Sequence, residues 1–260
     1  MTLTAFLFKN RLRISPASLS ACEYALRNMH RSLDPLHNHL HIYSMLESLH
    51  SFINADPNIK SQIDFDVLLV AICWHDVWKS GKNPRHKRAI IFHNLAEGLA
   101  AMRLFSRYAK IHPLPKVQVK KINYAIRKHS AVQILPKRTL EARILKDLDA
   151  LEMWSFSRIA NAVKHNGGVK NIPYKLFLLF SWYFSFWQLR RTTNNYYLDW
   201  SKNEFLIRRR RFLIQLSAFL DQLIHPHPNT SSLLRDKKSN QLSITRKIIL
   251  KGLSSINSTT

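Results

Sequence analysis

The stretch LLVAICWHDVWK, residues 68–79, constrains the fold more than any other part of the sequence. It is apolar almost throughout, shows no alternation of apolar and polar residues, and is followed by Ser80 and Gly81. This pattern predicts a buried helix that ends near the glycine. His75 and Asp76 would then lie at the buried end of that helix, where an imidazole and a carboxylate are costly without a binding partner. A divalent metal binds both kinds of group, so the pair is a candidate metal site.

The composition of the whole chain favours a globular all-α fold. The 260 residues are 46% hydrophobic and 11% aromatic, enough for one substantial core or two small ones. Only 5 residues are glycine, and alternating stretches of Val, Ile and Thr are few. The cysteines, Cys22 and Cys73, have no CxxC partner, which favours a reducing compartment over a disulfide scaffold.

Charge and pattern divide the chain into three segments. Residues 1–22 contain no acidic residue and form a basic N-terminal segment. They are expected to be the ordinary start of a cytoplasmic protein or, alternatively, an organelle-targeting segment. Residues 23–225 carry the periodic apolar pattern and form the predicted folded domain. From residue 226 to 260 this pattern gives way to Pro, Ser, Asn, Lys and Arg, which predicts a flexible basic tail.

The net charge of +24 points to an anionic partner. Forty Lys and Arg residues stand against sixteen Asp and Glu residues, and such a surface attracts nucleic acid, nucleotides or anionic lipid. A basic protein without such a partner is an equally open interpretation. No apolar stretch reaches the length of about 18 residues that spans a bilayer, so no transmembrane segment is predicted. The stretch 176–189 comes nearest and is interpreted as a core helix.

Two histidines lie near the start of the first long predicted helix. Asp34 followed by Pro35 is a typical helix start, with Asp as the N-cap. His37 and His41 are four residues apart and would share a face of this helix. They are either surface histidines or members of an inward-facing group.

Further polar residues fall on the inward faces of later helices. His93 and Glu97 are four apart on the apolar stripe of a helix predicted over 88–109, where each needs a polar partner. His129 lies on the inward face of the next helix, predicted over 116–130. Each inward histidine is either a core residue with a satisfied hydrogen bond or a ligand.

Two aspartates follow in the segment 139–165. Asp147 and Asp149 are two residues apart. At about 100° per residue they face different sides of a helix, so at most one of them joins an inward cluster.

Taken together, these motifs resemble the HD superfamily of metal-dependent phosphohydrolases. Residues 37–42, HNHLHI, are similar to the first-helix signature of that family, in the HNxxH form of its cyclic-nucleotide phosphodiesterases. Residues 75–79, HDVWK, are similar to HDxGK, with Trp78 in place of glycine. Residues 140–151 resemble the E-x-x-I-L-x-D-A-D-x-L segment of bacterial HD hydrolases. The resemblance covers roughly residues 25–225, with the motifs in the family's order.

The resemblance implies an HD-domain-like helical bundle with a metal site that holds one or two ions. A divalent metal (Mn²⁺, Fe²⁺, Co²⁺ or Mg²⁺) would be held there, and His37 would protonate the leaving group. The implied ligands are His41, His75, Asp76 and Asp149.

The remaining candidate residues surround this implied site. Lys79 and three residues of the basic loop, Arg85, Lys87 and Arg88, would bind phosphate. His93, Glu97 and His129 would support the catalytic group through hydrogen bonds, in preference to binding a second metal. No acidic residue follows the His-Asp pair at positions 77–80, so the general base is unassigned.

The resemblance implies a metal-dependent phosphohydrolase that acts on a nucleotide or another phosphoester. Two alternatives stay open. An HD-type nuclease on DNA or RNA is favoured by the +24 charge and by residues 93–94, which resemble a nuclease-type HD segment. The other alternative is a catalytically inactive HD scaffold that binds polyanions.

Overall fold

The structure is a computed structural model of the chain. It describes residues 1–32, 34, 36–81, 87–129, 136–165, 167–168, 172, 184–224, 242–250 and 253, without the side chains of residues 87–96, 185 and 186. Every regular element within these ranges is helical and none is a strand, so the prediction of an all-α fold is confirmed. No described helix combines the length and apolar character that crossing a bilayer requires.

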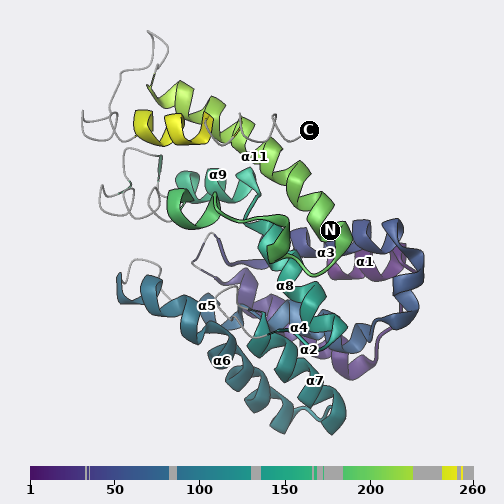
Figure 1. Cartoon of the computed structure of the whole chain (residues 1–260). Helices are drawn as coiled ribbons and strands as arrows, with labels where there is room; N and C mark the ends of the chain where they lie inside the picture. Colours follow the sequence, from purple (N-terminus) through teal and green to yellow (C-terminus); the bar gives the residue numbers. More distant parts are fainter. Residues whose placement is uncertain are drawn as a thin grey trace. The chain divides into compact units, whose positions relative to one another are not determined.

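The chain separates into two compact units, Met1–Met153 and Trp154–Thr260. The boundary between them falls inside the segment 23–225 that the sequence analysis treats as one domain. The first unit contains every described candidate residue for the metal site. Its elements are α1 (Leu3–Lys9), α2 (Pro16–His30), α3 (His39–Ala55), a 3₁₀ helix (Pro57–Gln62), α4 (Phe65–Trp74), α5 (Val77–Ser80), α6 (Lys87–Ile111), α7 (Lys116–Lys128) and α8 (Leu140–Glu152) (Figure 1).

Helix α4 is the centre of the first unit. Its N-cap Asp64 accepts a hydrogen bond from the backbone N–H of Val67, and every residue of the helix except Asp66 is buried. It packs against α2, α7 and α8. Burial of each large apolar side chain stabilises the fold by about 1.5–3 kcal/mol. The buried helix predicted from the sequence is therefore confirmed.

The end of this helix differs from the prediction. Helix α4 ends at Trp74, and Asp76 leaves the helical region with φ −112° and ψ 4° before the short helix α5 begins. His75 thus becomes the C-cap of α4. The N–H of His75 still donates to the carbonyl oxygen of Ala71 at 3.0 Å, and the break at Asp76 places both side chains at the junction of two helices.

Helix α3 also begins later than the sequence predicts. Its N-cap is Asn38, whose side chain accepts a hydrogen bond from the N–H of Leu40 at 2.9 Å. The predicted N-cap, Asp34, instead accepts from the N–H of Leu36 at 2.9 Å. His37 therefore precedes the helix that carries His41.

Helices α6 and α7 form a tightly packed hairpin. Gly98 of α6 lies against α7: a Cβ at this position would stand 2.7 Å from the carbonyl oxygen of Arg127 and 3.0 Å from that of Ile126. Only glycine allows this approach. It brings Glu97 of α6 beside His129, the residue that caps α7.

The second unit is built around aromatic side chains. Its described elements are α9 (Phe156–His165), a π-helical turn (Phe184–Gln188), a 3₁₀ turn (Thr193–Asn195) and α11 (Asp199–Ile224). Trp154 packs edge-on against Phe205 and Phe212 of α11. Residues 242–250 are helical, with Leu242 and Ile249 buried. The predicted flexible tail is therefore not confirmed over these residues.

Candidate metal centre

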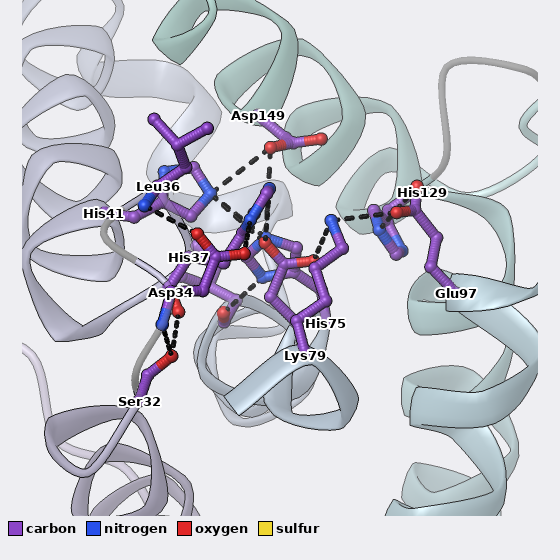
Figure 2. A network of polar contacts seen from close by, with 12 residues as sticks. Ser32, Asp34, Leu36, His37, His41, His75, Lys79, Glu97, His129 and Asp149 are labelled. Atoms are coloured by element: carbon purple, nitrogen blue, oxygen red, sulfur yellow. Dashed lines mark hydrogen bonds and ion pairs between the residues drawn. The ribbon is translucent and has the colours of Figure 1, made fainter. Parts of the chain in front are cut away.

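Side chains from three separate elements converge in the first unit (Figure 2). The Nε2 atom of His41, on α3, lies 3.3 Å from Nε2 of His75, 3.7 Å from Oδ2 of Asp76 and 3.3 Å from Oδ1 of Asp149, on α8. Nε2 of His75 lies 3.3 Å from Oδ2 of Asp76 and 3.9 Å from Oδ1 of Asp149. We refer to these four residues as the ligand cluster.

The spacing within the ligand cluster suits a coordinated metal ion. Nitrogen and oxygen ligands at about 2.0–2.2 Å from a metal stand about 2.8–3.6 Å from one another. The five separations, 3.3 to 3.9 Å, lie close to this range. They are longer than an ordinary N–H···O hydrogen bond of about 2.7–3.2 Å. Two imidazoles and two carboxylates are also a donor set that first-row divalent metals accept.

Burial makes this cluster costly without a cation. His41, His75 and Asp76 are 4%, 1% and 2% exposed. Oδ1 of Asp76 has the ammonium of Lys79 at 2.9 Å, whereas Oδ2 accepts no well-aligned hydrogen bond within the described part of the chain. A buried carboxylate oxygen without such a partner is unfavourable. Asp149 has a side chain that is 24% exposed, so it marks the open side of the cluster.

The backbone fixes which nitrogen of His75 is free to bind. Nδ1 of His75 lies 2.7 Å from the carbonyl oxygen of Ile72. A carbonyl only accepts, so Nδ1 carries the proton and donates it. In the neutral ring, Nε2 therefore presents its lone pair to the ligand cluster, the arrangement typical of metal-binding histidines.

Electrostatics in the metal-free cluster favour a proton where a metal would bind. Burial lowers the pKa of His75, but the carboxylates of Asp76 and Asp149 outweigh burial and raise that pKa to about 9. Burial raises the pKa of Asp76, but the charges of Lys79 and His75 hold it well below its usual range. The pKa of Asp149 is likewise lowered: the hydrogen bond from His41 and the charge of His75 outweigh burial. A divalent cation would have to displace the His75 proton.

A buried lysine lies beside the ligand cluster. Lys79, on α5, is 7% exposed, and its Nζ atom lies 2.9 Å from Oδ1 of Asp76 and 2.8 Å from Oε2 of Glu97. Burial lowers the pKa of Lys79, but these carboxylates outweigh it and raise the pKa above its ordinary value. The ammonium group thus joins two carboxylates, and its predicted role in phosphate binding stays a prediction. We call Lys79, Glu97 and His129 the lysine cluster.

The lysine cluster adjoins the ligand cluster through Asp76. Ligand-type atoms of Asp76, Glu97 and His129 lie within 4.8 Å of one another, so this group has the composition of a second metal site. The ammonium of Lys79 contacts two of these three residues, Asp76 and Glu97. Nδ1 of His129 donates to the carbonyl oxygen of Ile126 at 2.6 Å, and Nε2 lies 3.7 Å from Oε1 of Glu97. This arrangement favours a supporting role for Glu97 and His129 over a second metal.

His37 lies at the rim of the site with an acidic partner. Its Nδ1 atom is 2.7 Å from Oδ2 of Asp34, and its Nε2 atom is 4.0 Å from Oδ2 of Asp76. Burial raises the pKa of Asp34, but the hydrogen bond and charge of His37 lower it to about 2. Asp34 therefore stays ionised and orients the His37 ring. The sequence pattern predicts Asp34 as a helix cap, but its position three residues before a histidine is the signal that could have revealed this pairing.

The two aspartates of α8, Asp147 and Asp149, face different sides of the helix, as expected for residues two positions apart. Asp149 joins the ligand cluster, whereas Asp147 is fully buried elsewhere, with Oδ1 at 3.3 Å from Nζ of Lys146. Four other predicted site residues cannot be placed. Arg85 lies outside the described residues, as do the side chains of Lys87, Arg88 and His93.

Comparison with known proteins adds no relative: no protein-family model, curated protein or solved structure matches the chain significantly.

Proposed function

We propose that this protein is a metal-dependent phosphohydrolase that hydrolyses a nucleotide or a related phosphoester. The observation that carries the proposal is the convergence of His41, His75, Asp76 and Asp149 from three elements at separations of 3.3 to 3.9 Å. Their order and chemistry agree with the HD-type motifs in the sequence.

The ligand cluster would hold one divalent metal, with Mn²⁺, Fe²⁺, Co²⁺ and Mg²⁺ as the candidates. When bound, such an ion supplies Lewis acidity toward phosphoryl oxygens and lowers the pKa of coordinated water. The exposed side of Asp149 is where substrate would approach.

The residues around the cluster have separate roles in this proposal. His37, oriented by Asp34, holds a proton at the rim of the site and donates it to the leaving oxygen, as a general acid does. Lys79 is a positioning residue. Its ammonium contacts Oδ1 of Asp76, whereas His41 and His75 lie near the other oxygen, Oδ2. The lysine therefore fixes the carboxylate and leaves Oδ2 directed at the ligand cluster. The residue that deprotonates water stays unassigned.

The test is metal analysis together with hydrolysis assays on the purified protein. Asp149→Asn removes a ligand charge without changing side-chain size, and Asp56→Asn is the matched control because Asp56 is exposed at the end of α3. We expect wild type and the control to bind one equivalent of Mn²⁺ and to release phosphate from a nucleotide panel. The Asp149→Asn variant should lose both properties.

Two outcomes would change the proposal. Full metal content and full activity in Asp149→Asn would place the site elsewhere. Tight metal binding by wild type without hydrolysis of any substrate would favour the inactive scaffold.

A further inference from the structure

The hairpin formed by α6 and α7 has an unusual charge composition. Residues 98–128 contain no Asp or Glu, although sixteen occur in the whole chain. The same residues contain eight of the forty Lys and Arg residues, and all eight side chains are described. These are Arg103, Arg107, Lys110, Lys116, Lys120, Lys121, Arg127 and Lys128.

On α6, the basic residues form one stripe. Arg103, Arg107 and Lys110 follow i, i+4, i+7 spacing, which places them on one side of the helix, and all three are exposed. Phe105 and Tyr108 are buried on the opposite side. The basic stripe therefore faces away from the core of the first unit.

On α7, the same separation holds. Lys116, Lys120 and Arg127 are exposed and fall on one side at helical spacing, whereas Ile122 and Ile126 are buried on the other. At 1.5 Å per residue, the line from Lys116 to Arg127 is about 16 Å long. Basic side chains thus follow most of the length of the helix.

Five of these eight cations form no ion pair within the described residues. Lys121 pairs with Asp64 at 3.1 Å. Within the described residues no ion pair involves Arg103, Arg107, Lys110, Lys116 or Lys120. Exposed cations without anionic neighbours give a positive potential that is available to an external polyanion.

From this arrangement we propose that the outer face of the α6–α7 hairpin binds the sugar-phosphate backbone of a nucleic-acid strand. A row of charges about 16 Å long matches a chain of successive phosphates better than the compact phosphate group of one nucleotide. None of the eight basic residues belongs to the ligand cluster, so this binding does not require metal or hydrolysis.

An anionic membrane is the competing partner. Ile111 and Val117 are 76% and 67% exposed at the tip of the hairpin, next to Lys110 and Lys116. A membrane contact would use the tip alone. The basic residues instead continue along both helices to Arg103 and Arg127, which favours an extended strand.

The experiment removes three charges from the hairpin of the full-length protein. The test variant is Arg107→Gln, Lys116→Gln and Lys120→Gln combined. The matched control removes three charges at exposed positions of the second unit: Arg210→Gln, Arg211→Gln and Lys247→Gln. Binding to labelled 30-nucleotide single-stranded DNA, single-stranded RNA and duplex DNA is measured with EDTA present, across a salt series. Vesicles with and without phosphatidylserine form a further arm.

We expect the test variant to bind the strand roughly 10- to 100-fold more weakly at 0.1 M salt, with a salt slope smaller by about 2 for single strands. The control should stay within a few-fold of wild type. Equal weakening in both variants, absent binding by wild type at low salt, or binding to anionic vesicles alone would overturn the proposal. Because EDTA is present, failure of the phosphohydrolase proposal leaves this result unaffected.

Unchanged circular dichroism and melting temperature would confirm that the test variant is folded, as expected for exposed side chains. If the triple variant unfolds, the single variants Lys116→Gln and Lys120→Gln serve the same test. Each should weaken binding several-fold and reduce the salt slope by about 0.7.

Discussion

His75 and His129 are held in the same way but lie in opposite electrostatic surroundings. Each caps a helix and donates its Nδ1 proton to the carbonyl oxygen three residues earlier, Ile72 and Ile126 respectively. Burial lowers the pKa of both rings. Carboxylates outweigh burial at His75 and raise its pKa to about 9, whereas at His129 burial and the charge of His75 prevail and the pKa is lowered.

The difference between the two pKa values comes from the carboxylates close to His75 and from the positive charge of His75 beside His129. Lys79 distinguishes the two surroundings in a second way, through the carboxylates that it contacts. The carboxylate nearest to His129 belongs to Glu97, and that group already has the Lys79 ammonium at 2.8 Å. His75 faces Asp76 and Asp149, of which only Asp76 contacts the lysine. The buried ammonium of Lys79 therefore contacts two of the three ligand-type side chains in the group of Asp76, Glu97 and His129, but only one of the four in the ligand cluster. A candidate metal site must therefore be judged by the cations that already contact its carboxylates as well as by its donor atoms.

The largest effect is expected at Asp76, which belongs to both groups. Asp76→Ala should reduce metal affinity and phosphoester hydrolysis by several orders of magnitude, because a charged ligand is lost. Metal content and hydrolysis are measured beside Asp56→Ala as the control. A variant that keeps full metal and full activity would show that the His-Asp pair is structural.

Lys79→Met should remove the ammonium beside Asp76 and Glu97, so that Asp76, Glu97 and His129 become a second metal site. Without metal, the variant should lose about 3–5 kcal/mol of unfolding free energy, because the buried Asp76 and Glu97 carboxylates lose their shared cation. With Mn²⁺ it should bind a second equivalent, measured by elemental analysis. Lys121→Met, at an exposed ion pair, is the control and should change stability by less than about 1 kcal/mol. A stable variant that still binds a single metal would refute the role given to Lys79.

The pH dependence of metal-free stability should reveal the raised pKa of His75. Its folded pKa of about 9 lies above the unfolded value of about 6.5, so the protonated ring stabilises the fold below pH 6.5. This contribution should disappear between pH 6.5 and 9, with a slope of at most about 1.4 kcal/mol per pH unit. Denaturant unfolding in EDTA measures it, and His75→Gln should flatten the profile. Metal affinity should rise over the same interval, because the ligand must lose its proton.

The smallest effect is expected at the rim of the site. Asp34→Asn keeps the hydrogen-bonding shape beside His37 but removes the charge of the carboxylate that orients its ring. We expect kcat to fall by about tenfold while metal content stays at the wild-type level. Loss of metal in this variant would instead place Asp34 among the groups that support the ligand cluster.

Much of this site follows from local sequence patterns. The apolar run of residues 68–79 predicts the buried helix, although not its end at Trp74, and helical spacing predicts that at most one of Asp147 and Asp149 joins the cluster. Glu97 and His129 likewise fall on inward faces, and both are buried. Periodicity predicts these features because it records which face of a helix meets the core.

Tertiary structure alone decided how these residues combine. The bridge from Lys79 to Glu97 and the approach of His41 to Asp149 depend on distances between different elements. The break at Asp76 also appears only in the folded chain. Gly98 reveals its role only when α7 lies against it. A sequence pattern specifies the face on which a side chain lies, but not the depth or rotation at which two helices meet. Separations of a few ångströms, such as those from Asp76 to Lys79 and to His41, arise only from that packing.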